Sequence, residues 1–373
     1  MDLTQLIHAL LQGAASFTWG NAVMLAIGGA LMALAIVKGY EPVLLLPIGF
    51  GCALANLGMS YENGLMKVLY DAGIQTELFP LLIFIGVGAM IDFRPLLAMP
   101  AMVILGAAGQ FGIYGTLILA SLLGFSLKQS ASIGVIGAID GPTAIFVATR
   151  LAPEMLGPIA VAAYSYMSLI PIIQPPIMRL MTTRQERLTH MAYSPRPVPA
   201  AAVIAFPIVV TVAVSLLAPS AAPLIATLML GNLLKESGVV DRLSKTAQNE
   251  LINVTTLFLG LAIGSTMTAK NFINWPTAGV LGLGLLAFVL DTMAGLAFGK
   301  LMYLVTRGKV NPLIGACGIS AFPMAGRLSA KMALDEDYTN FILMHAMGSN
   351  TAGQLGSVVA GGLLLALVGG FVH

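Results

Sequence analysis

Long apolar segments recur along the whole chain, and they constrain its fold more than any other feature. A transmembrane helix needs about 20 predominantly apolar residues to cross the hydrocarbon core of a bilayer. Within lipid the backbone must satisfy its own hydrogen bonds, so such segments form helices. The chain is therefore predicted to be an all-α polytopic membrane protein. The candidate spans are roughly 21–38, 42–58, 78–93, 97–124, 157–180, 200–218, 222–235, 252–268, 277–298 and 339–371, with 222–235 the shortest.

The composition agrees with this interpretation and excludes other classes. The chain is 58% hydrophobic and 9% charged, whereas a soluble domain carries about 25% charged residues. A net charge of +2 gives no electrostatic basis for binding nucleic acid. No Walker A loop, Rossmann fingerprint or His/Cys metal cluster is found. The first charged residues are Asp2 and Lys38, so we expect no cleaved signal peptide, and residues 3–16 are predicted to form an interfacial helix.

Two further apolar stretches, 130–151 and 311–332, contain residues that interrupt a helix. The first contains GAIDGPT from Gly137 to Thr143, where Gly and Pro flank a carboxylate. The second contains GISAFP from Gly318 to Pro323, which resembles the first motif at an offset of 318 − 137 = 181 residues. We therefore predict a membrane repeat at 1–181, a basic cytoplasmic loop at 182–199 and a second membrane repeat at 200–373. Broken segments at corresponding places in two repeats are typical of transporter binding sites.

The basic residues predict how the two repeats lie in the membrane. Each repeat contains five spans, an odd number, so the repeats have opposite orientations. With the N-terminus outside and both broken segments re-entrant, 14 of the 18 Lys and Arg residues lie on the cytoplasmic side. We expect an inverted repeat with two opposed hairpins, 130–151 entering from outside and 311–332 from inside, whose tips meet near the midplane. If the broken segments instead cross fully, the repeats become parallel and the charge bias weakens.

Asp140 is the central candidate for function. An Asp at mid-membrane costs roughly 2.5–3.5 kcal/mol on insertion scales, and a bound cation is the simplest group that offsets this cost. Half-helix ends and unwound carbonyl groups are good ligands for sodium, and Thr143 stands beside the carboxylate. The alternatives are that Asp140 caps a half-helix, pairs with a buried Arg or carries a proton.

Other polar residues leave two interpretations open. Tyr166 either reaches the site or anchors the helix at the membrane surface. Gln174 either lines a cavity or satisfies backbone groups freed by the following prolines. A buried Arg needs an anion, so Arg327 would hold Asp140 or a substrate carboxylate, unless it lies on the cytoplasmic surface. The polar run at 350–354 favours helix packing, given the glycines that follow it.

Several longer motifs resemble one family. The chain is similar, over nearly its whole length, to the membrane β subunit of sodium-pumping biotin-dependent decarboxylases, which serves oxaloacetate, methylmalonyl-CoA and glutaconyl-CoA decarboxylases. One departure is that Ser349 precedes Asn350 where a Pro is expected. The motifs are LPIGFG at Leu46–Gly51, IDGPT at Ile139–Thr143, AYSYM at Ala163–Met167, QPPI at Gln174–Ile177 and MHAMG at Met344–Gly348.

This resemblance implies a lyase and translocase activity. In that family the β subunit decarboxylates carboxybiotin carried by a partner, consumes a proton and drives sodium out of the cell. Asp140 then matches the intramembrane sodium and proton site, and Tyr166 matches a Tyr that handles the same ions. Arg327 matches an Arg that is a plausible partner for the carboxybiotin carboxylate. The residues implied to form sodium sites are Asn311, Gly315 and Ser320.

The resemblance also implies partners and a location. We expect a carboxyltransferase α subunit, a small membrane γ-type subunit, a biotin carrier protein and a homo-oligomer within the complex, all at the inner (plasma) membrane. Biotin would be attached to the carrier and not to this chain. The alternative function is a sodium-coupled secondary transporter of an organic anion, since inverted repeats with opposed hairpins suit both, and Arg327 could hold a substrate carboxylate.

Overall fold

The computed structural model describes residues 17–59, 64–191 and 197–370, and within these ranges it contains helices and no strand. The predicted helix at 3–16 lies outside the described residues. Labels with η mark short 3₁₀ or π turns. The first half contains α2 (Trp19–Lys38), α3 (Pro42–Leu54), η1 (Ala55–Met59), α4 (Leu65–Leu69), η2 (Tyr70–Gln75), α5 (Leu78–Met90), α6 (Arg94–Ala98), α7 (Met102–Ala108), α8 (Phe111–Leu122), α9 (Leu127–Gly134), η3 (Val135–Ala138), α10 (Gly141–Leu151), η4 (Pro153–Met155), α11 (Leu156–Met181) and α12 (Arg184–Arg187).

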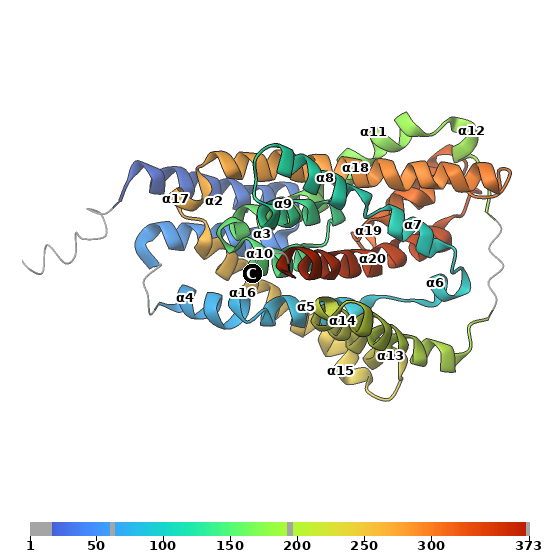
Figure 1. Ribbon diagram of the computed structural model, residues 1–373, viewed down its shortest axis with the longest axis horizontal. Helices are drawn as coiled ribbons and strands as arrows, with labels where there is room; N and C mark the ends of the chain where they lie inside the picture. The colour runs from blue at the N-terminus through green and yellow to red at the C-terminus, as the bar shows by residue number, and fades with distance from the viewer. Residues whose placement is uncertain (1–16, 60–63, 192–196, 371–373) are drawn as a thin grey trace, which may run out of the picture.

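The second half follows a similar sequence of long helices and breaks. It contains α13 (Ala200–Leu217), η5 (Pro219–Ala221), α14 (Ala222–Glu236), α15 (Asp241–Thr246), η6 (Ala247–Leu251), α16 (Ile252–Thr266), α17 (Ala269–Phe272), α18 (Trp275–Val305), η7 (Pro312–Gly318), α19 (Met324–Glu336) and α20 (Leu343–Gly370). The longest helix, α18, has 31 residues and runs along the long axis of the molecule (Figure 1).

Seven helices of the described part are long and apolar enough to cross a membrane, which confirms a multi-pass membrane protein. An eighth span is possible if Leu65–Gln75 and Leu78–Met90, bent by 60° against each other, are counted together. Three of the ten predicted spans are short helices by themselves: α5 has 13 residues, and α14 and α16 have 15 each. The seven helices are Trp19–Lys38, Pro42–Met59, Met102–Leu122, Pro153–Met181, Ala200–Leu217, Trp275–Val305 and Leu343–Gly370.

The first broken segment is interrupted where its sequence predicts. After α9 and η3, Ile139 adopts a left-handed conformation with φ 53°, and Asp140 is extended with φ −123° and ψ 96°. α10 then begins with Pro142 in its first turn, where a fixed φ favours helix and the missing N–H is not needed. The backbone therefore passes through the tip without continuous helical hydrogen bonds.

The second broken segment is also interrupted. Asn311 caps η7, since its side-chain oxygen accepts a hydrogen bond from the backbone N–H of Leu313 at 3.1 Å. Ile319 is extended, with φ −81° and ψ 160°, and α19 starts only at Met324. The stretch between them leaves backbone carbonyl groups without helical partners.

Six helices form one row, in which α3 packs between α2 and α16, and α14 packs between α5 and α13. α5 and α16 close the row at its centre. Two glycines allow the closest approach: a Cβ at Gly88 would lie 1.8 Å from the Leu228 carbonyl oxygen, and one at Gly231 would lie 1.9 Å from that of Ile85. Small residues at such crossings are typical of membrane helices. The order of helices in the row is α2, α3, α16, α5, α14 and α13.

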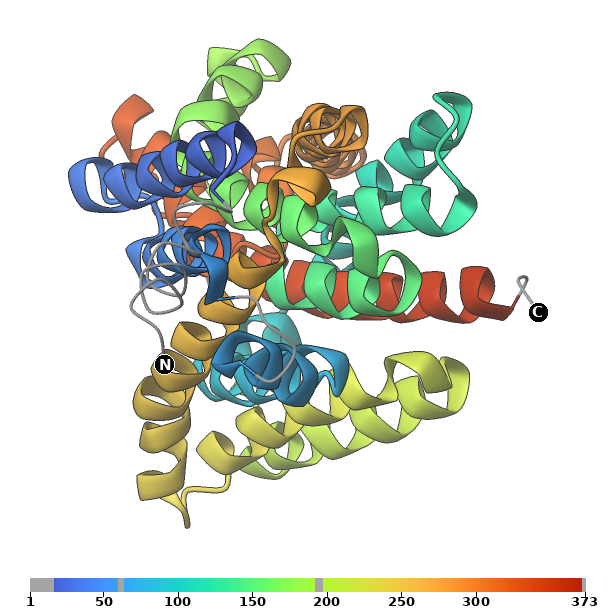
Figure 2. The ribbon, with the colours of Figure 1, turned by 90° about the vertical axis from the view of Figure 1, so that its left-hand side faces the viewer.

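The remaining long helices and both broken segments form a second unit, the bundle. α18 packs against η7, α11, α8 and η3, and α20 packs against α7, η7, α19 and α10. In Figure 2, α5, α13 and α14 lie on one side of α20, and α8 and α18 lie on the other. The two broken segments thus lie inside the bundle, next to the row.

The described part of the predicted basic loop, 182–191 and 197–199, contains α12 and is tied to the bundle at one end of the molecule. Arg187 forms an ion pair with Glu336 at 2.7 Å, and Lys300 forms one with Glu186 at 3.3 Å. His190 lies 2.8 Å from Asp337. The backbone N–H and hydroxyl of Thr339, together with His190, lower the pKa of Asp337 to about 2. Arg196 lies outside the described residues.

Candidate functional site

The tips of the two broken segments meet. The backbone N–H of Ser320 donates a hydrogen bond to the carbonyl oxygen of Ala138 at 3.0 Å. The Ser320 hydroxyl donates to the Gly353 carbonyl of α20, also at 3.0 Å. The first of these bonds joins residues 320 − 138 = 182 positions apart, because neither tip can satisfy its backbone internally.

Three side-chain amides, two from helices and one from the break between α7 and α8, satisfy carbonyl groups of the second broken segment. Asn350 of α20 donates to the carbonyls of residues 317 and 319, at 3.2 and 2.7 Å. Gln110, between α7 and α8, donates to that of Gly318 at 3.0 Å. Gln174 of α11 donates to that of Ala316 at 2.9 Å. Gln174 therefore meets neither of its two sequence interpretations: it does not line the cavity beside Asp140 and does not bond backbone freed by the following prolines, but satisfies a buried carbonyl of the second broken segment.

Asp140 lies at the crossing with its carboxylate held by three side chains. Its Oδ2 accepts hydrogen bonds from the Thr143 hydroxyl at 2.6 Å, the Gln354 amide at 2.9 Å and the Ser357 hydroxyl at 3.0 Å. Asp140 is 6% exposed, and it forms no ion pair within the described residues. Three donors on one oxygen stabilise a charge that would otherwise be costly at this depth.

A cavity of about 370 Å³ separates the bundle from the row, and Asp140 lies in its wall. Bundle residues that line it include Tyr164, Ser320 and Gln354, while Glu41 at the start of α3 contributes a second carboxyl. Burial raises the pKa of the Glu41 carboxyl. The other lining residues from the row are Val43, Leu44, Ile83, Val87, Met90, Gln248, Ile252, Asn253 and Thr256.

The structure brings Tyr164, and not Tyr166, to this cavity. A Cβ at Gly141 would lie 2.1 Å from the Tyr164 ring, so the ring packs directly on the residue after Asp140. The Tyr164 hydroxyl is buried and has no hydrogen-bond partner among the described residues. The Tyr166 hydroxyl instead donates to the Leu281 carbonyl of α18. Helical spacing places the two rings on different faces of α11.

Asn311 and Gly315 lie away from Asp140, while Ser320 lies beside it. The Asn311 amide donates to the carbonyls of Arg187 and Thr189 at 2.8 and 2.9 Å, so it fastens the loop to the second broken segment. Gly315 packs against α18, where a Cβ would lie 2.1 Å from the Gly295 carbonyl oxygen. Ser320 is the one of these three that lines the cavity.

Arg327 lies on the exposed surface of α19. It forms no ion pair with any described residue and does not line the cavity. Its exposure fits the alternative in which this Arg stands at a water-accessible surface. A carboxylate brought from outside the chain could reach it there.

Sequence reasoning missed four polar residues that the structure brings forward. Gln354 and Ser357 follow Asn350 on one face of α20, at spacings of four and seven residues, and that periodicity could have identified them. Tyr164 could have been separated from Tyr166 only by knowing which face of α11 meets Asp140. Asp291 could have been identified from the sequence, because it is the single charged residue in the predicted span 277–298.

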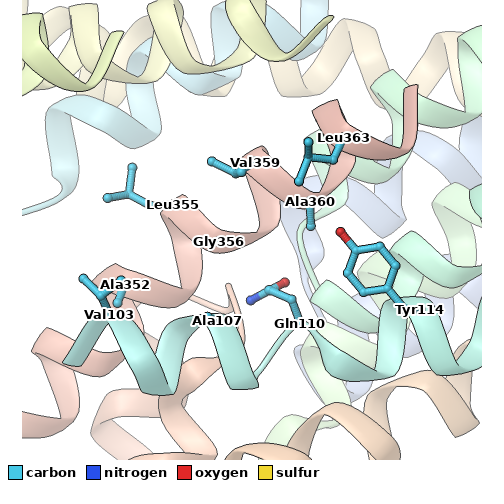
Figure 3. Close-up of a pocket in the computed structure, with 10 residues that line it drawn as sticks. All are labelled: Val103, Ala107, Gln110, Tyr114, Ala352, Leu355, Gly356, Val359, Ala360 and Leu363. Atoms are coloured by element: carbon cyan, nitrogen blue, oxygen red, sulfur yellow. The ribbon is translucent and has the colours of Figure 1, made fainter. Parts of the chain in front are cut away.

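A second cavity, also of about 370 Å³, lies between α20 and the break that separates α7 from α8 (Figure 3). Gln110 and Tyr114 are its polar side chains, and the remainder of its lining is aliphatic or glycine. Val103 at its edge is 53% exposed. Because it offers few oxygen ligands and opens on the apolar surface, it does not suit a sodium ion.

Residues 20–368 match the family described as Na+-transporting oxaloacetate decarboxylase beta subunit. Glutaconyl-CoA decarboxylase subunit beta of Acidaminococcus fermentans is 53% identical over 361 residues, covering 96% of each chain. Methylmalonyl-CoA decarboxylase subunit beta of Veillonella parvula is 52% identical over 357 residues, covering 95% of each.

A third relative has lower sequence identity but matches an equally large share of the chain. The oxaloacetate decarboxylase beta chain of Klebsiella pneumoniae is 43% identical over 428 residues, covering 97% of this chain and 99% of its own. The family match spans nearly the whole sequence, and the seven long apolar helices fit a membrane subunit. The resemblance inferred from the motifs is thereby confirmed. The chain belongs to the family of β subunits of sodium-transporting decarboxylases, and its role is that of a decarboxylase subunit.

Proposed function

We propose that this chain decarboxylates carboxybiotin carried by a partner protein and couples the reaction to outward sodium transport. The observation that supports this most is the arrangement at Asp140. One carboxylate, held by three side-chain donors, lies in the wall of a cavity where two broken segments cross. A charge at this depth suits a step in which a small cation binds and leaves.

Sodium, as the transported substrate, would bind at the Asp140 carboxylate. The hydroxyl groups of Thr143 and Ser357 direct their hydrogens to Asp140, which leaves lone pairs on their oxygens for a hard cation. Ser320 adds a further oxygen at the cavity. Asn311, Gly315 and Tyr166 would contribute to the sodium sites by holding the second broken segment and α18 in place.

The proton consumed by decarboxylation would displace the sodium ion. Carboxybiotin and a proton yield biotin and carbon dioxide, so each turnover needs one proton at the site. If this proton arrives through Asp140, neutralising the carboxylate removes the charge that holds sodium. Arg327 would bind the carboxybiotin carboxylate, because an exposed guanidinium without an ion pair is available to an incoming anion.

We also propose that the chain is an inverted repeat, with boundaries at 1–181 and 200–373. The order of helices in the row supports this, because exchanging α2 with α13, α3 with α14 and α5 with α16 reproduces the same order from the other end. The broken segments correspond in the same way if α8 is exchanged with α18. The first broken segment packs on α8 through α9 and η3, and the second packs on α18 through η7. Movement of the bundle against the row would then open the cavity to alternate sides.

The assembly would follow from the chemistry that this chain lacks. A carboxyltransferase α subunit would load biotin on a carrier protein, a small γ-type membrane subunit would join them, and several copies of this chain would assemble in the complex. With Lys38, Arg94 and Arg187 on the cytoplasmic side, the positive-inside rule places Arg327 there too. The location would be the inner (plasma) membrane.

Sodium transport by the intact complex tests the proposal. The complex is reconstituted in vesicles, supplied with each candidate acid or acyl-CoA, and followed by radioactive sodium uptake with and without avidin. We expect uptake that requires decarboxylation and stops with avidin. Uptake that ignores avidin and follows an organic-anion gradient would overturn the proposal in favour of a secondary transporter.

A pair of variants ties the transport to the site. Asp140→Asn should abolish sodium-coupled activity, because the amide cannot carry the charge that binds sodium or release a proton. Asp241→Asn, at an exposed position of α15, is the matched control and should leave uptake unchanged. Sodium-coupled activity that survives in Asp140→Asn would contradict the assignment.

A further inference from the structure

A second buried carboxyl, Asp291, lies in the bundle and takes no part in the site described above. It belongs to α18 and is 0% exposed. α18 packs at the same time on α8, α11, η3 and η7, so this residue lies where both broken segments meet a single long helix.

One carboxylate oxygen has a clear structural role. Asp291 Oδ1 accepts a hydrogen bond from the backbone N–H of Gly112. The backbone N–H of Ile113 donates a further hydrogen bond to the same carboxyl group. α7 ends at Ala108 and α8 begins at Phe111, so the first-turn N–H groups of α8 need acceptors. Asp291 therefore caps α8 from a neighbouring helix.

The other oxygen has no such role. Asp291 Oδ2 is buried and has no hydrogen-bond partner among the described residues. It faces the backbone of η3, since a Cβ at Gly137 would lie only 2.6 Å from it, and the Ala287 side chain closes the same space at 2.8 Å. An ionised oxygen left without a partner in an apolar interior costs several kcal/mol, about 1–3 or more for each unsatisfied group.

No cationic side chain compensates this carboxyl. Asp291 forms no ion pair, and no side chain donates to it, within the described residues. The titratable groups on the elements packed against α18 are Lys128 of α9, Tyr114 of α8, Tyr164, Tyr166 and Arg179 of α11, and Cys317 of η7, and those on α18 itself are Lys300 and Tyr303. The hydroxyl of Tyr166 and the thiol of Cys317 bond backbone carbonyls instead.

We propose that Asp291 is a second proton-binding group, neutral while η3 is closed over it and ionised only when the first broken segment moves away. Closure leaves Oδ2 room for a proton but not for water or a cation. Opening at Gly137 admits water, which takes the proton and solvates the carboxylate, and no other bond changes. Proton occupancy is thus linked to the position of a segment that carries Asp140 three residues later.

The coupling to transport rests on the proposed function, but the proton itself can be observed without transport. Infrared spectra of the purified complex show a carbonyl band for a protonated carboxylic acid. We expect this band in the wild type and in Asp140→Asn, and its loss in Asp291→Asn, which keeps an oxygen to cap Gly112. Spectra of wild type and Asp291→Asn that are identical in this region would overturn the proposal, whatever the outcome of the sodium experiments.

A second variant tests the contact with η3. Gly137→Ala introduces a methyl group against Oδ2, so the band of Asp291 should shift in frequency and exchange faster with deuterium. This arm remains informative if Asp291→Asn does not fold. A band unmoved in Gly137→Ala would mean that the acid is not the one at this contact, and the proposal would fail.

The pH dependence of sodium uptake separates a proton site from a cap. Asp291→Asn should slow uptake about tenfold and remove one ionisation from its pH profile, because the amide cannot release a proton. The neighbouring change Thr292→Val is the control and should keep the profile. An Asp291→Asn complex with the wild-type rate and profile would show that Asp291 only caps α8, which contradicts the proposal.

Discussion

Asp140 and Asp291 are both buried, yet their surroundings differ in kind. Asp140 receives side-chain donors from α10 and α20 and lines a cavity. Asp291 receives only backbone donors and faces the closed backbone of Gly137. The first arrangement keeps a charge accessible to an ion, and the second encloses the acid until the fold opens. Residue type therefore predicts little here without the donors around it.

At this scale, the two tyrosines of α11 should behave differently. Tyr164→Phe keeps the ring on Gly141 but removes a buried hydroxyl that has no partner among the described residues and is therefore free to act on an ion in the cavity. If this oxygen contacts sodium with a strength comparable to one hydrogen bond of ~1 kcal/mol, the sodium concentration for half-maximal uptake should rise about threefold to tenfold. This concentration is measured by following the rate of decarboxylation at increasing sodium concentrations.

The paired change Tyr166→Phe distinguishes position from general damage. It removes a hydrogen bond to the Leu281 carbonyl and should lower thermal stability by about 1 kcal/mol. If Tyr166→Phe shifts the sodium titration more than Tyr164→Phe does, the assignment of Tyr164 as the cavity tyrosine loses its functional meaning, and the role that the family resemblance gives to Tyr166 is favoured.

At the scale of elements, helices are joined by close backbone crossings and by capped breaks. α5 and α14 cross at Gly88 and Gly231 with almost no space for a side chain. The second broken segment is held at its start by Asn311 and along its carbonyls by three amides. Packing of α5 on α14 in the row depends on glycines that have no side chain at the crossing. The broken segments of the bundle depend instead on polar side chains, whose hydrogen bonds replace the missing helical ones.

Gly88→Ala should destabilise the α5–α14 crossing by about 1–3 kcal/mol, since the methyl group would collide with the Leu228 carbonyl oxygen. The control is Gly282→Ala on α18, where a Cβ has nothing within 4 Å and better helix propensity should give a gain of up to ~1 kcal/mol. Thermal unfolding in detergent compares the two. Equal melting temperatures would mean that this crossing is not tight.

Asn311→Ala should release the loop from the second broken segment. It removes the cap on Leu313 and two hydrogen bonds to the loop, together about 2 kcal/mol of stability. Trypsin should then cleave faster after Arg187, whose side chain is 12% exposed. Asn249→Ala, which removes one exposed hydrogen bond, is the control. Unchanged cleavage with weaker sodium affinity would make the Asn311 amide a direct sodium ligand.

At the scale of the molecule, charged side chains gather at the two ends and the cavity lies between them. Arg150 pairs with Glu77 at one end, and Arg94 pairs with Glu236 at the other. In Figure 1, α4 and α17 lie toward one end of the long axis, with α6 and α12 toward the other. The cavity separates the row from the bundle, so relative movement of these two units is the motion that would expose Asp140.

A cysteine in the cavity can report this motion. Val87→Cys places a thiol on the row side of the cavity, and we expect a small water-soluble thiol reagent to modify it more slowly when sodium is bound. Native Cys52 and Cys317 are both 0% exposed and should remain unmodified. Asn249→Cys at the surface is the control. Labelling of Val87→Cys that is the same with sodium and with potassium would contradict a sodium-dependent cavity.

The sequence by itself determined what depends on local pattern. Apolar segments of about 20 residues predict membrane helices, and glycine and proline around Asp140 predict the break that the backbone shows at Ile139. The motifs from Leu46 to Gly348 predict the family, which the comparison confirms. These features are properties of neighbouring residues, so no knowledge of the fold is required to find them.

Only the tertiary structure decided which distant groups meet. Asp140 and Ser357 are 217 residues apart and bond because two broken segments cross against α20. The choice of Tyr164 over Tyr166 depends on which face of α11 meets that crossing, and the enclosure of Asp291 depends on η3 closing over α18. The physical reason is that unwound backbone and buried charge must find partners across the chain, and packing geometry alone fixes which partners lie within hydrogen-bond reach.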